Sequence, residues 1–270
     1  MNDSDPIAAL DAIARPAMVA SHFRSGTHLL MDLIRRQFRP FRPSMRPFES
    51  IHATYLSLDR FDDNNHRPIE PAGALELLRK ATRSTLKTHA LPSFDRVRAE
   101  VRPFHAALVE RSTALYAVRD GRDVLCSMHA WMRSFRDEPE ADFEAFCFDP
   151  LPHSGVSRAR EWNDHVLAWL DRPATHTVRF ERIVKDTRSV LDELGTILGE
   201  QPAHRAPLLP RPIKSVRAAW LARALGRVES TNVHSGGIPP LKRAEAFDDR
   251  SNQRFLDDAG EATERLGYAP

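Results

Sequence analysis

The stretch from Pro16 to Ile34 constrains the fold of this 270-residue chain more than any other. Its unbroken apolar run over residues 17–20 is typical of a buried parallel strand. The apolar residues that follow recur at helical spacing: Leu29, Leu30, Leu33, Ile34 and Phe38. The stretch therefore predicts a strand, a tight loop and the start of a helix.

The loop between that strand and helix contains Arg24, Ser25, Gly26 and Thr27. Backbone N–H groups at a helix start lack helical partners and lie at the positive end of the helix dipole, so this loop can bind an anion. The Gly-x-x-x-x-Gly-Lys-Ser/Thr pattern, with its lysine and magnesium-binding hydroxyl, is absent. We therefore expect an anion bound without magnesium, and an ordinary strand-to-helix turn is the alternative.

A second predicted strand begins at Thr85 and ends near His89, with Pro92 closing the turn. Ligands of open parallel sheets bind at the carboxyl ends of the strands, which makes His89 a candidate catalyst. Lys87 lies two residues earlier and is expected on the same face. Taken alone, such a histidine is more often a hydrogen-bonded structural residue.

The strand expected over residues 113–118 repeats this arrangement, since a turn and a helix with apolar spacing follow it. Arg119 leaves the strand at its carboxyl end, where a guanidinium can bind two phosphate oxygens, so a second anion site is predicted there. Asp120 or Asp123 is expected to cap the helix, and Arg122 is expected to be solvated.

The rest of the chain alternates in the same way. Helices are predicted over residues 5–14, 72–83, 140–148, 156–170, 190–198 and 214–225 and in a last segment ending near 266, with a strand over 175–181. Trp162 and Trp169 belong to a core stripe. The pattern predicts an α/β fold with a parallel sheet flanked by helices.

Two irregular segments remain open to interpretation. The proline-rich segment from Arg39 is expected to be extended, and its arginines, with Arg42 and Arg46, either line a binding mouth for an anionic acceptor or are solvated on a surface loop. The loop over residues 230–240, which contains Gly236 and Gly237, either closes over a ligand or only connects helices.

Composition favours a single domain over residues 1–270, since no linker or change in composition divides the chain. Charged residues make up 28% and hydrophobic residues 41%, which suits a globular protein better than a disordered or membrane one. No apolar run approaches membrane-spanning length and the first residues are acidic, so we expect a cytoplasmic protein. The net charge of +2 gives no reason to expect nucleic acid as a partner.

The two cysteines, Cys126 and Cys147, do not form a Cys-x-x-Cys pair, and we expect both to be reduced and inert. No metal site is predicted.

Four motifs in this order resemble the cytosolic sulfotransferase family: Phe-Arg-Ser-Gly-Thr (residues 23–27), Leu-Lys-Thr-His-Ala-Leu-Pro (86–92), Val-Arg-Asp-Gly-Arg-Asp-Val-Leu-Cys-Ser (118–127) and Val-Arg-Phe-Glu-Arg-Ile-Val-Lys-Asp (178–186). The resemblance implies a P-loop-like, three-layer α/β fold related to nucleotide kinases. It also implies 3′-phosphoadenosine 5′-phosphosulfate (PAPS) as the sulfuryl donor, 3′-phosphoadenosine 5′-phosphate (PAP) as the product, and no metal.

The same resemblance implies roles for individual residues. The donor's 5′-phosphosulfate would be bound by the consecutive residues Arg24, Ser25, Gly26, Thr27 and His28. Its 3′-phosphate would be bound by Arg119 and Ser127, and its adenine would lie beside Phe180. His89 matches the catalytic histidine and would act as general base, with Lys87 and Arg24 as cations.

The chain departs from the family pattern in four places. Phe23 replaces a proline, His28 replaces a hydroxyl residue and Leu29 replaces an aromatic residue. The late Arg-Lys-Gly loop is not recognisable, and Ser235-Gly-Gly, followed by Lys242 and Arg243, is its nearest counterpart.

The implied function is sulfuryl transfer to a hydroxyl or amine of a small-molecule acceptor, which could be anionic or a sugar. A kinase-like phosphotransferase on the same fold and a non-catalytic nucleotide-binding protein are the alternatives, and the absent Walker lysine argues against the first. Assembly into a homodimer is left open.

Overall fold

The computed structural model describes residues 5–49, 51–135, 142–210, 220–221, 224–225 and 240–269. The chain forms two compact units. The first consists of Met1–Ser21, Thr27–Ala117 and Ala174–Ser235, and the second of His22–Gly26, Val118–Pro173 and Gly236–Pro270. Each unit draws on separate stretches of the chain, and the single domain over 1–270 stays a prediction.

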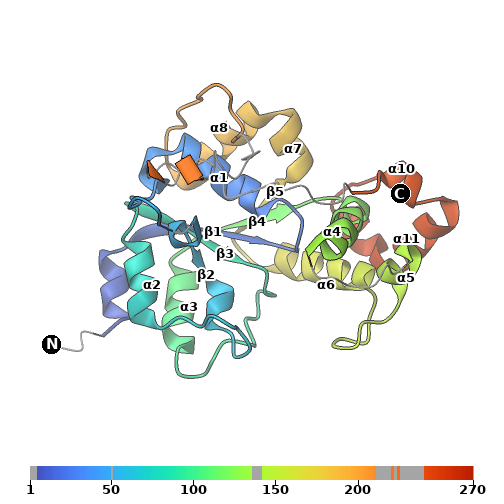
Figure 1. Ribbon diagram of the computed structural model, residues 1–270, viewed down its shortest axis with the longest axis horizontal. Coiled ribbons are helices and arrows are strands. Elements are labelled where there is room, and N and C mark those ends of the chain that lie inside the picture. Colours follow the sequence, from blue (N-terminus) through green and yellow to red (C-terminus); the bar gives the residue numbers. More distant parts are fainter. Residues whose placement is uncertain are drawn as a thin grey trace. The chain divides into compact units, whose positions relative to one another are not determined.

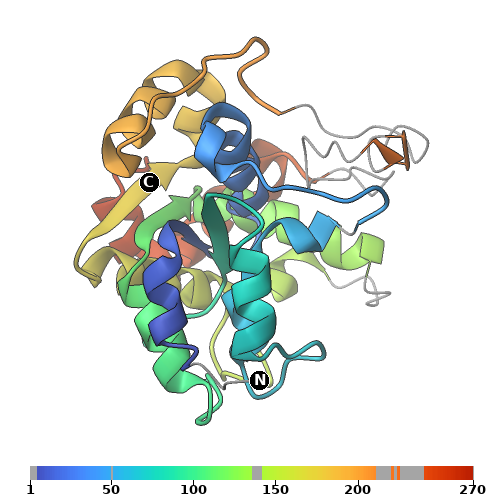
Figure 2. The same cartoon turned by 90° about the vertical axis from the view of Figure 1, so that its left-hand side faces the viewer.

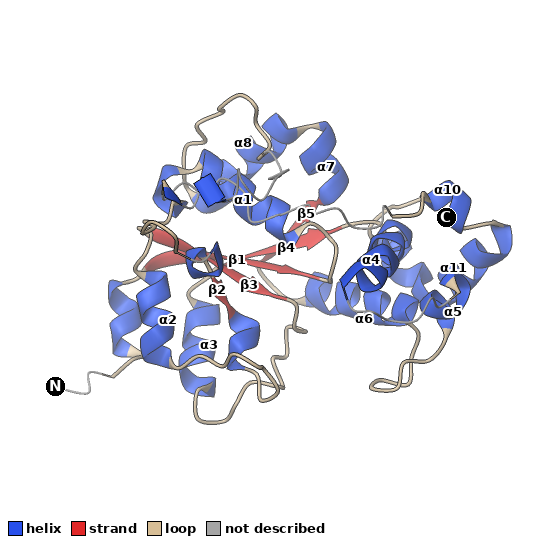
Figure 3. Cartoon of the chain, in the orientation of Figure 1, coloured by secondary structure: helices blue, strands red, loops and turns tan. Residues whose placement is uncertain are grey.

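A five-stranded sheet, red in Figure 3, forms the centre of the first unit, with strand order β2-β3-β1-β4-β5. The strands are β1 (Ala14–Ser21), β2 (Leu56–Ser57), β3 (Arg83–Thr88), β4 (Thr113–Val118) and β5 (Thr175–Arg179). β1 pairs in parallel with β3 on one side and with β4 on the other. The carboxyl ends of these three strands therefore meet at one edge of the sheet.

Helices cover both faces of this sheet (Figures 1 and 2). They are α1 (Thr27–Gln37), α2 (Pro71–Leu78), α3 (Arg102–Glu110), α7 (Phe180–Lys185) and α8 (Thr187–Leu198), and four 3-10 turns accompany them: η1 (Ala8–Ala12), η2 (Arg39–Phe41), η3 (Ile51–Thr54) and η4 (Leu58–Phe61). In Figure 1, α1, α7 and α8 lie on one face, and α2 and α3 lie on the other. The predicted three-layer α/β fold is confirmed.

The strongly apolar residues of β1 explain its central place. Its last six residues are buried, as expected for a strand covered on both faces. Ala17 and Val19 belong to the same buried cluster as Leu30 and Ile34 of α1 and Leu191 of α8. This packing holds the start of α1 directly after the carboxyl end of β1.

Helices dominate the second unit: α4 (Gly121–Phe135), α5 (Phe143–Phe148), α6 (Arg158–Asp171), α10 (Arg243–Ala246) and α11 (Asp249–Arg265). Trp162 and Trp169 are fully buried in its core, as predicted, and the Trp162 ring lies 5.8 Å from the ring of Phe255. Cys126 and Cys147 are buried and free, and burial raises the pKa of Cys126 to about 12, which keeps it a thiol.

Several element boundaries differ from the prediction. The helix expected over 72–83 ends at Leu78, because the chain enters β3 at Arg83. The strand expected over 175–181 ends at Arg179, and Phe180 opens α7. Only the 3-10 turn η1 forms within residues 5–14, and the segment from Arg39 contains the turn η2 where extended chain was expected.

The elements β2, η4 and α3 were not predicted at all. Most of the helix predicted over 214–225 and nearly all of the loop predicted over 230–240 lie outside the described residues. None of the described helices is both long and apolar enough to cross a membrane.

Candidate functional site

The loop between β1 and α1 carries a buried hydroxyl group. Arg24 and Gly26 have positive φ angles of 65° and 96°, which turn the chain sharply around Ser25. The Ser25 side chain is buried, and its Oγ has no hydrogen-bond partner among the described residues. A buried polar atom without a partner is costly, so an anion that accepts a hydrogen bond here would stabilise the loop.

In the second unit, three of the predicted donor-binding residues come together. The Nε of Arg24 donates a hydrogen bond of 3.2 Å to the Oγ of Ser127. Burial and the charge of Arg119 lower the pKa of Arg24, which means that the two guanidinium groups are close enough to repel each other. Such a pair is stabilised by an anion bound between them or beside them.

In the first unit, His89 follows β3 directly and its ring is held by the end of β1. The Nδ1 atom donates a hydrogen bond of 2.8 Å to the backbone oxygen of Ser21. A carbonyl oxygen can only accept, so the neutral ring carries its proton on Nδ1 and its lone pair on Nε2. This tautomer can take a proton at Nε2.

Asp59 in η4 positions the same strand end, and sequence reasoning missed it. Its Oδ1 accepts a hydrogen bond of 2.7 Å from the Thr88 hydroxyl and another of 3.0 Å from the backbone N–H of His89. Asp59 belongs to an unpatterned segment far upstream of His89, and no motif in the sequence marks it.

His28, the second residue of α1, lies in a cationic environment. Burial, and after it the nearby Lys87, His89, Arg35 and His52 in that order, lower its pKa to about 3. His28 is therefore neutral at pH 7. These couplings also show that Lys87 and His89 share one neighbourhood, as predicted from their spacing.

The other predicted residues of this unit have clear positions. Thr27 is the first residue of α1, and its hydroxyl forms a short hydrogen bond with the hydroxyl of Ser21. Burial lowers the pKa of Lys87, while the charge of Asp59 opposes this effect. Phe180 follows the outer strand β5 as the first residue of α7, so the sheet order places β4 between its strand and β1.

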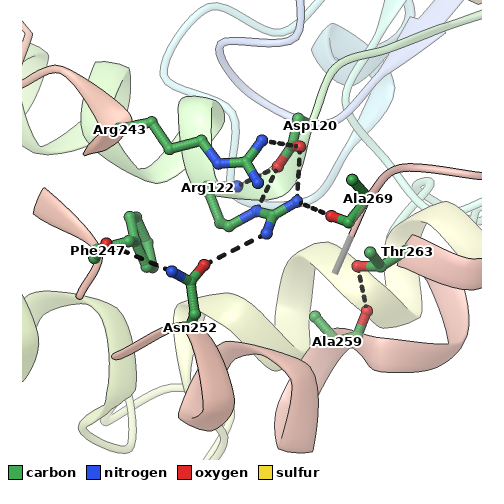
Figure 4. A network of polar contacts seen from close by, with 8 residues as sticks. All are labelled: Asp120, Arg122, Arg243, Phe247, Asn252, Ala259, Thr263 and Ala269. Atoms are coloured by element: carbon green, nitrogen blue, oxygen red, sulfur yellow. Dashed lines mark hydrogen bonds and ion pairs between the residues drawn. The ribbon is translucent and has the colours of Figure 1, made fainter. Parts of the chain in front are cut away.

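Asp120, the residue after Arg119, is the acceptor in a network of arginines in the second unit (Figure 4). Its carboxylate accepts from the backbone N–H of Arg122 at 3.0 Å and so caps α4, as predicted. It also accepts from the Nε and Nη2 atoms of Arg122, at 3.0 and 2.9 Å, and from Nη1 of Arg243 at 2.8 Å.

Arg122 is fully buried, so the prediction that it is solvated was wrong. Besides Asp120, it donates to Asn252 Oδ1 at 3.3 Å and to the backbone oxygen of Ala269 at 2.5 Å. A buried guanidinium is tolerated when it is paired and its donors are satisfied, which this network achieves. Through Arg122, the network connects Ala269 in the C-terminal segment to Asp120, which directly follows Arg119.

The arginines of the segment from Arg39 do not lie at the edge of the sheet that carries His89. The ring of Phe41 stacks at 4.7 Å on the guanidinium of Arg83, the first residue of β3, and the N–H of Ser44 donates to the oxygen of Lys80 at 2.6 Å. β3 begins there and ends before His89, so this segment lies at the amino edge. The two interpretations of its arginines, as the mouth of an acceptor site or as a solvated surface loop, both stay predictions.

The part of the chain that the structure describes holds no group of three or more histidine, cysteine or acidic side chains arranged for a metal ion. The expectation of chemistry without a metal stays a prediction. Of the nearest counterpart of the family's late loop, residues 235–237 lie outside the described residues, and Lys242 and Arg243 lie within them.

Comparison with known proteins agrees with the motifs. A model of the sulfotransferase domain matches residues 15–209. A crystal structure of the mouse sulfotransferase SULT7A1 complexed with PAP is 17% identical to this chain, with a TM-score of 0.53 over 99% of this chain and 91% of that one. A retinol dehydratase in complex with androsterone and PAP is 15% identical, with a TM-score of 0.48 over 95% and 83%.

No match was found among curated protein sequences. The matched domain nevertheless spans β1 through α8 and includes the loop after β1, His89 and Arg119. On the strength of that match, with the fold in agreement, the chain belongs to the sulfotransferase family and is a sulfotransferase.

Proposed function

We propose that this sulfotransferase uses PAPS as its donor, transfers the sulfuryl group to a hydroxyl or amine of a small-molecule acceptor and releases PAP, with His89 as general base. The observation that carries the proposal is the hydrogen bond from His89 Nδ1 to the Ser21 oxygen, which gives Nε2 the lone pair. The mouse sulfotransferase of similar fold is complexed with PAP, which supports the same nucleotide here.

The anion-binding groups fit a donor with two phosphate-bearing ends. For the 5′-phosphosulfate, we propose the consecutive residues Arg24, Ser25, Gly26, Thr27 and His28. The buried Ser25 hydroxyl supports this assignment, because it has no partner among the described residues. His28 would act as a neutral hydrogen-bonding group, since burial and neighbouring cations keep its pKa low.

For the 3′-phosphate, we propose Arg119 and Ser127, with the adenine beside Phe180. The mutual repulsion of Arg24 and Arg119 supports this assignment, because a nearby anion would relieve it. Ser127 already accepts a hydrogen bond from Arg24, so its hydroxyl proton remains available to a phosphate oxygen.

In the proposed reaction, His89 Nε2 takes the proton of the acceptor as the acceptor's oxygen or nitrogen bonds to sulfur. The bond between sulfur and the oxygen of the 5′-phosphate breaks, and that oxygen leaves with the electron pair. Lys87 and Arg24 stabilise the charge that develops on it. The hydrogen bond to Ser21 keeps the imidazole in the required tautomer and orientation.

The test compares wild type with His89→Ala in two assays. Mass spectrometry of a panel of alcohols, phenols and amines, anionic compounds and sugars among them, is used to detect the gain of one sulfuryl group in the presence of PAPS. Calorimetry measures the affinity for PAP. We expect His89→Ala to lose about a hundredfold or more in turnover and to keep the affinity for PAP. The exposed His176 supplies the control variant, His176→Ala.

Arg119→Lys separates donor binding from catalysis. Lysine keeps the charge but cannot form the paired hydrogen bonds of a guanidinium, so we expect PAP affinity to fall about tenfold. A His89→Ala variant as active as wild type would refute the role of the base. PAP binding without turnover across the panel would favour a non-catalytic protein, and phosphate transfer from ATP would favour a phosphotransferase.

A further inference from the structure

Four large apolar side chains gather on the surface of the first unit. Phe48, Trp220, Leu221 and Leu225 are 54%, 60%, 55% and 59% exposed. The rings of Phe48 and Trp220 lie 5.6 Å apart, and the N–H of Leu225 donates to the oxygen of Leu221 at 3.0 Å, which places these two leucines on one helical turn. These four residues are called the apolar patch. In Figure 2, the orange segment near residue 220 lies beside the blue loop that precedes residue 50.

Phe48 is held outward by a strained turn. Its φ is 62°, a left-handed conformation that is a genuine outlier for a bulky residue and costs about 1 kcal/mol or more. The turn is closed by two hydrogen bonds between Arg46 and Glu49: the Arg46 N–H donates to the Glu49 carboxylate at 3.0 Å, and the Glu49 N–H donates to the Arg46 oxygen at 3.1 Å. A strained turn that exposes an aromatic ring in spite of its cost in free energy points to a binding surface.

Arginines precede Phe48 in the same segment of the chain. Burial and the charges of Arg205, Arg39 and Arg36 lower the pKa of Arg42, so these three guanidinium groups each lie near that of Arg42, which also donates to the Arg36 oxygen at 3.0 Å; the four are called the arginine cluster. Arg39 and Arg205 are exposed. Three carboxylates of the same unit already have cationic partners: Glu49 pairs with Lys80, Glu200 with Arg83 and Asp192 with His204. The sequence adds to this charge, because residues 201–228 contain no acidic residue.

We propose that the apolar patch and the arginine cluster dock this protein on the surface of an anionic phospholipid membrane. Tryptophan, phenylalanine and leucine side chains insert at the boundary between headgroups and acyl chains, and arginines bind lipid phosphates. Each arginine near a negatively charged membrane surface contributes modestly to the affinity, and several together give a salt-dependent attraction.

The position of this surface suits a docking role that is independent of the proposed catalysis. The turn at Phe48 lies beside Lys80, just before the start of β3. Lys80 pairs with Glu49, and its backbone oxygen accepts a hydrogen bond from the Ser44 N–H. It therefore lies toward the amino edge of the sheet, and His89 lies at the carboxyl edge. Contact between two copies through this surface is disfavoured, because it would bring two arginine clusters together.

The test measures binding of the full chain to vesicles by flotation. One set contains phosphatidylcholine alone and the other contains phosphatidylcholine with about a third phosphatidylserine. We expect binding to the anionic set only, weakened by salt, with a blue shift of tryptophan emission that is lost in Trp220→Phe. Phe48→Ser/Trp220→Ser and Arg39→Gln/Arg42→Gln should each reduce vesicle binding about tenfold or more.

Val184, an exposed residue of α7, supplies the matched control Val184→Ser, which should bind vesicles like wild type. Thermal unfolding and PAP affinity of all variants should match wild type, which separates this proposal from that of the donor site. Absence of binding to anionic vesicles, or equal binding to neutral ones, would overturn the proposal. So would a dimer that dissociates in Phe48→Ser/Trp220→Ser without any vesicle binding.

Discussion

Asp59 holds the end of β3 through the Thr88 hydroxyl and the His89 N–H, and a shift of this strand end would move the imidazole. Asp59→Ala removes the acceptor of both hydrogen bonds, so we expect turnover to fall about tenfold to a hundredfold, because misplacement by about 1 Å can cost that much. Asp59→Asn keeps an acceptor oxygen and should restore most of the loss. Turnover and acceptor KM measured for both variants check this prediction.

Asp63, which is exposed on the following loop, supplies the control variant Asp63→Ala. Equal turnover in Asp59→Ala and wild type would show that Asp59 does not position His89. A loss of the same size in Asp59→Asn would instead assign the effect to the charge of Asp59, which acts on Lys87.

At this scale, residues inside a short motif were predictable and residues recruited from elsewhere were not. His89 and Lys87 share a neighbourhood because their strand spacing requires it. Arg24 and Arg119 are close because both follow adjacent parallel strands. The contact of Asp59 with His89 and the burial of Arg122 involve segments that are distant in sequence. The residues around Asp59 and Arg122 form no pattern that indicates these contacts.

Among the elements, the start of α4 is packed most tightly. A Cβ atom added at Gly121 would lie 2.7 Å from Cδ2 of Trp162 and 2.7 Å from Cζ of Phe255. Gly121→Ala should therefore lower the free energy of unfolding by about 1–3 kcal/mol, because two buried rings must shift. Chemical denaturation measures this change.

Gly260 in α11 gives the matched control, since a Cβ atom there meets nothing within 4 Å. Gly260→Ala should leave the free energy of unfolding unchanged or raise it by up to about 1 kcal/mol. If Gly121→Ala proved as stable as wild type, the packing of α4 against α6 and α11 would be looser than these distances indicate.

Element types followed from periodicity, and their ends depended on tertiary structure. The apolar run of β1 and the helical spacing of α1 identified both elements, because burial on two faces or on one face leaves a clear pattern. The ends of α2 and β5 differed from the prediction, since Arg83 and Phe180 are as compatible with one element as with the next. β2 has only two residues, too few for any pattern.

Across the whole molecule, buried histidines make stability depend on pH. Burial lowers the pKa of His22 to about 4, of His28 to about 3 and of His105 to about 4, whereas an unfolded histidine titrates near 6.5. Below pH 6.5 the unfolded chain therefore binds more protons than the folded protein. Stability should be full above pH 6.5 and fall as the pH drops toward 4.

Urea denaturation between pH 7.5 and pH 5 tests this dependence. His105→Phe should flatten it, because His105 packs against Phe61 and Phe94 and its Nε2 has no partner among the described residues. His176→Phe, at an exposed position, should leave the slope as in wild type. A slope equal in wild type and His105→Phe would mean that His105 contributes nothing to it.

The contact between Arg122 and the carbonyl oxygen of Ala269 has a consequence for C-terminal truncation of this protein. A truncation before Ala269 would remove a hydrogen-bond acceptor of the Arg122 guanidinium. This group is fully buried, so water could not replace the lost acceptor. The disturbance would lie next to Arg119, far along the chain from the cut, and a fall in PAP affinity would be mistaken for a defect of the proposed donor site itself.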